Sequence, residues 1–125
     1  MNRNYIFELI AVKLNATGFD FYKNKAKKGA AFPYVTYRTQ LSTETDIDTH
    51  DDIDFRLIIN VWDNIKDSTR LESIITSIDA AISFANLSSE YVSIYVNREG
   101  ILDLPDPDEF IKHTEMTFLL EVRFK

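Results

Sequence analysis

Apolar side chains alternate with polar ones across residues 54–62, and the spacing then becomes helical. A strand with one buried face has an apolar side chain at every second position. Four residues follow this pattern: Phe55, Leu57, Ile59 and Val61. After a polar turn, one apolar stripe recurs at 3.6 residues per turn, made of Leu71, Ile74, Ile75, Ile78, Ala81, Ile82 and Ala85. We predict a strand that ends at Trp62, then a helix that packs on the sheet. Thr69 and Glu72 have the spacing of a capping box, which makes Thr69 the expected N-cap.

The clearest strand pattern lies in residues 112–125. Its apolar face consists of Met116, Phe118, Leu120, Val122 and Phe124. Polar side chains hold most of the other face, so a shift of one residue would invert every position. We also predict strands at 32–40 and 91–96, and a short edge strand near 19–22. Residues 101–109 include two prolines and are predicted to be an extended connection that joins no ladder.

Residues 4–15 are predicted to form the first helix. Apolar side chains surround it almost completely, so it needs two packing partners. The sheet covers one side, and either the second helix or a neighbouring subunit covers the other. The candidate contact residues on this helix are Tyr5, Phe7, Leu9 and Val12. The second helix carries small side chains opposite its apolar stripe, which let another helix come close; its candidates are Ser73, Ser77 and Phe84.

The order of the predicted elements is helix, two or three strands, helix, two strands. This order indicates an α+β fold: a mainly antiparallel sheet of four to five strands, with two helices packed on one face and a long β-hairpin arm. A chain of 125 residues suits a single domain, 1–125, and is long enough to bury a core.

The charge of the chain limits its partners. A net charge of −6 and a pI near 4.8 disfavour binding to DNA or to an anionic membrane. The chain has no cysteine, which removes disulfides and thiolate chemistry. No apolar run approaches the roughly 18 residues that span a bilayer. We expect a soluble protein that is not exported and does not contact a membrane.

Residues 41–52 form the acidic arm between two predicted strands. Its carboxylates are Glu44, Asp46, Asp48, Asp51 and Asp52. Alternate carboxylates resemble a calcium loop, but the glycine and the closing glutamate of such a loop are missing. An arm of this length often makes a contact. It could meet the lysines of an adjacent copy, which are Lys23, Lys25, Lys27 and Lys28.

Residues suited to catalysis are few. The three glycines lie far apart, which argues against a dinucleotide fingerprint or a phosphate loop. His113 and Glu115 would share one strand face and could bind a metal with a third ligand, but the solvated outer face of a sheet explains them better. We therefore expect no catalytic, cofactor or metal site. A small enzyme or metal-dependent hydrolase remains the alternative, and metal analysis would test it.

Several local strings resemble the tail terminator and neck proteins of long-tailed bacteriophages. They are the first helix, the string Phe32-Pro33-Tyr34-Val35-Thr36-Tyr37-Arg38, the acidic hairpin, the strand at 56–62, the long helix, and an Ile-Leu-Asp-Leu-Pro turn before the last strand. The lysine cluster lies outside this pattern. The resemblance covers nearly the whole chain.

The resemblance implies a structural virion protein in the neck, assembled in the host cytoplasm. Such a protein forms a homo-oligomeric ring, usually a hexamer, that caps the tail tube, ends its polymerisation and joins the head, with DNA passing through without specific binding. It implies the tail tube protein and a head-completion or connector protein as partners. A head-completion protein that binds the portal side is the alternative.

Overall fold

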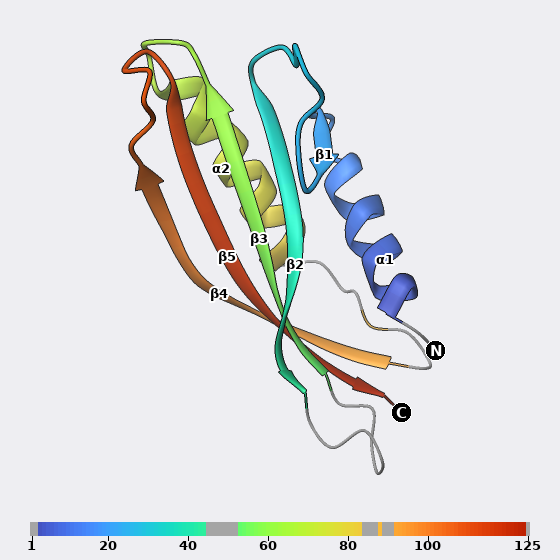
Figure 1. Cartoon of the computed structure of the whole chain (residues 1–125). Helices are drawn as coiled ribbons and strands as arrows, with labels where there is room; N and C mark the ends of the chain where they lie inside the picture. The colour runs from blue at the N-terminus through green and yellow to red at the C-terminus, as the bar shows by residue number, and fades with distance from the viewer. Residues whose placement is uncertain (1–2, 45–52, 84–87, 89–91, 125) are drawn as a thin grey trace.

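The computed structural model describes residues 3–44, 53–83, 88 and 92–124. It shows one five-stranded sheet with two helices packed against one of its faces (Figure 1). The elements are α1 (Arg3–Asn15), β1 (Phe21–Lys23), β2 (Tyr34–Glu44), β3 (Ile53–Asp63), α2 (Thr69–Ser83), β4 (Val92–Leu104) and β5 (Lys112–Phe124). The α+β class predicted from the sequence is confirmed.

The strands follow the order β1-β2-β3-β5-β4. β1 runs parallel to β2, and the other neighbours are antiparallel. The sheet is therefore mainly antiparallel, and the short strand expected near residue 21 lies at its edge. β2, β3, β5 and β4 form the long body of the sheet (Figure 1).

The core lies between the sheet and the helices. Leu57 pairs with Phe118 and Ile59 with Met116, and all four side chains are buried. The helices contribute Ile10 and Leu14 from α1 and, from α2, Leu71, Ile74, Ile75, Ile78 and Ile82. The alternation predicted for β3 and β5 and the helical stripe of α2 thus face one another, as their patterns require.

The expected capping box at the start of α2 is wrong. The carboxylate of Asp67 accepts hydrogen bonds from both the backbone N–H (2.9 Å) and the hydroxyl (2.7 Å) of Thr69. The Thr69 hydroxyl donates to a residue before the helix, and the Glu72 N–H donates to the Ser68 carbonyl (2.9 Å) and not to Thr69. An aspartate caps a helix as well as a threonine does, and Asp67 lies in the turn where the chain enters α2.

The expectation that residues 101–109 join no ladder is wrong for the first four of them. Ile101 pairs with Met116 and Leu104 with His113, so β4 continues to Leu104. A bulge between Arg98 and Gly100 shifts the register and lets the strand go on. The prolines lie at 105 and 107, beyond the last paired residue.

The acidic hairpin begins as regular sheet. Residues 41–44 belong to β2, in which Leu41 pairs with Phe55 and Glu44 with Ile53. The strand predicted at 32–40 therefore begins two residues later and ends four residues later. Residues 45–52, with most of the predicted arm, lie outside the described residues.

Candidate interaction surfaces

The predicted contact residues of α1 lie in different surroundings. Phe7 and Leu9 pack against the core, and the Phe7 ring meets Phe55 edge to face at 5.7 Å. The Lys23 ammonium lies 5.4 Å from the centre of the Phe7 ring. Val12 is 65 % exposed and available to a partner. The side chain of Tyr5 lies outside the described residues.

The outer side of α2 is partly open. Ser73 is exposed and Ser77 is half-buried, whereas Phe84 lies outside the described residues. Asp79 accepts hydrogen bonds from Ser83 (2.7 Å) and from Arg98 of β4 (2.7 Å), which ties the helix to the edge of the sheet. Helix α2 also contacts α1, so the second helix is one partner of the first.

The acidic candidates belong to the arm between β2 and β3. Asp46, Asp48, Asp51 and Asp52 lie outside the described residues, as does the side chain of Glu44. Their proposed contact remains a prediction from the sequence.

An open backbone edge follows β1. The Val35 N–H donates to the Asp20 carbonyl (3.0 Å), and the Tyr37 carbonyl accepts from the Asn24 N–H (2.8 Å). Backbone groups of a strand repeat their direction every second residue. The N–H and C=O of Thr39 therefore point to the same side of β2 as those of Val35 and Tyr37, and at Thr39 no described strand pairs with β2 on that side. A hollow of about 260 Å³ lies there, lined by residues that include Phe7, Ala11 and Thr39.

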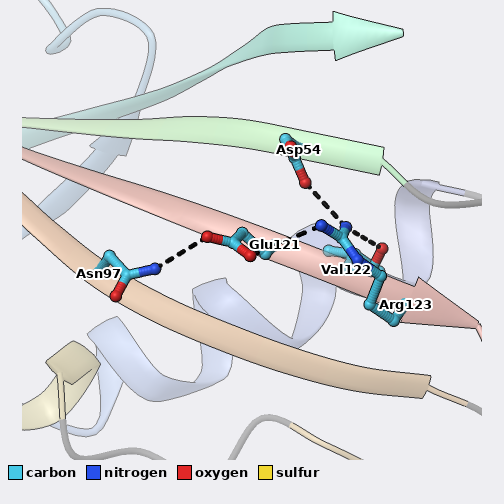
Figure 2. A network of polar contacts seen from close by, with 5 residues as sticks. All are labelled: Asp54, Asn97, Glu121, Val122 and Arg123. Atoms are coloured by element: carbon cyan, nitrogen blue, oxygen red, sulfur yellow. Dashed lines mark hydrogen bonds and ion pairs between the residues drawn. The ribbon is translucent and has the colours of Figure 1, made fainter. Parts of the chain in front are cut away.

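The face of the sheet away from the helices carries a chain of polar contacts (Figure 2). The Asn97 amide donates to Glu121 (3.0 Å), Glu121 pairs with Arg123 (3.5 Å), and Arg123 donates to Asp54 (2.9 Å). These contacts cross β4, β5 and β3, which fixes their register. On the same face Arg56 pairs with Glu99, the bulged residue of β4, at 2.7 Å.

The opposite end of that face carries a row of stacked rings. The Trp62 ring stacks on His113 at 4.3 Å and on Tyr34 at 5.1 Å, and Phe32 lies 5.2 Å from Tyr34. His113 Nε2 is 2.7 Å from the side-chain oxygen of Asn60. Burial lowers the pKa of His113 and favours the neutral ring. His113 thus completes an aromatic row, and the described residues include no group of three metal-ligating side chains.

The loop of residues 23–28, which carries Lys23, Lys25, Lys27 and Lys28 and is called the lysine loop below, borders this aromatic row. A hollow of about 400 Å³ lies between them, lined by residues that include Lys25, Lys27, Phe32, Tyr34 and Trp62. This site was not predicted because no aromatic residue stands among the lysines in the sequence. The available signal was position: Tyr34 begins one strand, Phe32 lies two residues before it, and Trp62 nearly ends the antiparallel neighbour. These rings must therefore meet at one end of the sheet.

An ion pair between a buried carboxylate and a partly exposed guanidinium joins β3 to α2. Asp63 is fully buried and accepts hydrogen bonds from the guanidinium of Arg70, including one at 2.8 Å from Nε. It also accepts from the Asn64 N–H at 2.8 Å. The Arg70 hydrogen bond is the main reason that the pKa of Asp63 lies below its ordinary value. The pair fixes the turn between strand and helix.

The described surfaces combine an open strand edge, polar and aromatic tracts and shallow hollows. No described helix has the length and apolar character needed to cross a bilayer. Such features are compatible with a small α+β protein that binds other chains. The family model described as tail completion protein gp17 matches residues 11–123. The chain belongs to this family, which confirms the resemblance to phage tail and neck proteins and indicates a structural role in the virion.

Solved structures share the fold. One, titled "Virion of native gene transfer agent (GTA) particle", is 14% identical and superimposes with a TM-score of 0.72 over 91% of this chain and 91% of that chain. Another is 15% identical, with a TM-score of 0.71 over 100% of this chain and 98% of that chain. No curated protein matches the sequence.

Proposed function

We propose that this structural protein of the phage tail and neck forms a ring, usually a hexamer, on the end of the tail tube. The ring ends tube polymerisation and offers the surface to which the head joins. Membership of the tail completion protein gp17 family is the observation that carries this proposal. The ring surrounds the path of the DNA, and the net charge of −6 supports this role because a negative lumen repels a negative duplex.

The contacts of the ring are heterologous, because a closed ring needs one surface of each copy to meet a different surface of the next. Val12 of α1 and Ser73 of α2 are exposed and supply such surfaces. The acidic arm, with Glu44 as its first carboxylate, docks onto the tube, the connector or the lysine loop of the next copy. Charge reversal of the four lysines then weakens assembly in a salt-dependent way.

The test uses tail tube protein assembled with and without this chain. We expect tubes of limited length that carry the chain at one end in electron micrographs, and a ring-sized mass by light scattering in the mixture. Val12→Glu should weaken the ring, whereas Lys66→Glu, a change at another exposed position, should not. Unlimited tubes that bind none of the chain would reject the proposal.

A head-completion protein that binds the portal side is the second candidate, because it would need the same kind of ring. The two differ in what they purify with. A tagged chain recovered with headless tails supports the tail role, and a tagged chain recovered with tailless, filled heads supports the head role.

A further inference from the structure

The lysine loop and the turn between β4 and β5 lie at the same end of the sheet, each near a different edge. Tyr34 begins β2, and the lysine loop comes before it; Leu104 ends β4 and Lys112 begins β5, and the turn of residues 105–111 joins them. The strand order places β1 and β2 on one side and β5 and β4 on the other. Figure 1 shows both connections at the upper end of the sheet.

The turn has the opposite chemistry to the loop. It carries Asp106, Asp108 and Glu109, followed by Phe110, whose side chain is 73 % exposed. Its shape is fixed from within: the Asp108 N–H donates to Asp106 (2.9 Å), and the Phe110 N–H donates to Asp108 (2.9 Å). An apolar ring is thus exposed to water beside three carboxylates.

The hollow beside the lysine loop complements this turn. Its lining includes the aromatic residues Phe32, Tyr34 and Trp62 together with Lys25 and Lys27. Neither lysine has a carboxylate partner among the described residues. A cavity of about 150 Å³ can hold benzene, so a hollow of about 400 Å³ has room for a phenyl ring and the backbone next to it.

We propose that the turn of residues 105–110 in one copy docks into this hollow of a second copy, with Phe110 against the aromatic residues of the lining and the carboxylates beside Lys25 and Lys27. Because the turn and the hollow are different surfaces of the chain, the contact is heterologous, and it can repeat around a ring when the rotation from copy to copy closes. The proposal rests on the self-assembly in the proposed function and names the surfaces that meet.

The chain has no cysteine, so introduced cysteines report the contact directly. We expect a mixture of Ala26→Cys and Glu109→Cys chains to form disulfide-linked dimers under mild oxidation. The matched control is Ala26→Cys with Lys66→Cys, because Lys66 is exposed in another connection at the same end of the sheet. The 26–109 pair should exceed the control by about fivefold or more. Equal yields would overturn the proposal.

Charge exchange tests the chemistry of the contact. Lys25→Glu with Lys27→Glu in the Ala26→Cys chain should lower the yield severalfold, because like charges then oppose each other. Adding Asp106→Lys and Asp108→Lys to the Glu109→Cys chain should restore it, and failure to restore it would refute the pairing. If the chain caps tubes but the 26–109 disulfide does not form, this contact is wrong and the proposed function stands. If the disulfide forms but the chain binds no tubes, the contact stands and the proposed function is wrong.

Discussion

Replacement of Leu120 by alanine should strongly destabilise the fold. Leu120 lies in the middle of β5, is fully buried, and pairs with Phe55 on one side and Val96 on the other. The change removes three carbon atoms from the core, which costs about 2.5 kcal/mol at about 0.8 kcal/mol for each. A residual cavity on the order of 50 Å³ adds about 1 kcal/mol. We therefore expect the free energy of unfolding to fall by about 3.5 kcal/mol.

The matched control is Leu102→Ala, the same substitution on the neighbouring strand. Leu102 is 58 % exposed, so we expect a loss of less than about 0.5 kcal/mol. Urea unfolding followed by circular dichroism measures both variants. At a slope of about 1.5 kcal/mol/M, the midpoint of Leu120→Ala should fall by about 2 M with the slope unchanged. Similar losses in the two variants would refute the assignment of these residues to opposite faces of the sheet.

Three further substitutions test the polar contacts. Asp63→Asn should lower the free energy of unfolding by about 2 kcal/mol, because it weakens the hydrogen bonds from Arg70. The pKa of Asp63 is lowered in the folded state, so the stability that this carboxylate contributes is lost as the pH falls. Between about pH 5 and 3 the free energy of unfolding should therefore drop more steeply in the unchanged protein than in the variant. Burial lowers the pKa of His113, so thermal stability should fall between about pH 7.5 and 5.5, and His113→Phe should remove that fall. Arg98→Met breaks a partly exposed ion pair with Asp79 and should change the unfolding free energy by no more than about 0.5 kcal/mol, measured in urea.

The sequence predicted best the elements in which one face is buried. In β3, β5 and α2 the spacing of apolar residues matches the geometry of the element, and a single core selects one register. Local hydrogen bonding was less predictable. Asp67, Ser68 and Thr69 are all good N-caps, so only the path of the chain decides which one acts. The bulge at Glu99, which lets β4 continue, is marked in the sequence by Gly100 alone, because a glycine inside a strand is typical of a bulge.

The candidate surfaces were predictable only in part, because they depend on which connections the fold brings together. The apolar residues all round α1 indicated a second packing partner, and α2 and the core supply much of it. The lysine loop was found by composition, but its aromatic neighbours come from two strands that are distant in sequence. Charge and spacing identify the pieces of such a surface, and topology alone shows which pieces meet.

The burial of α1 bears on how a ring would form. A helix with apolar residues on several sides needs packing partners on those sides. In this chain Phe7 and Leu9 pack against the core of the same molecule. Among the residues that the structure describes, the two most exposed apolar side chains are Val12 and Phe110. Val12 lies on α1 and Phe110 in the turn between β4 and β5, so they belong to different parts of the fold. Small separate contacts bind weakly one at a time and gain strength when a template holds the copies together. We therefore expect the tail tube to promote ring closure, with the isolated chain associating only weakly.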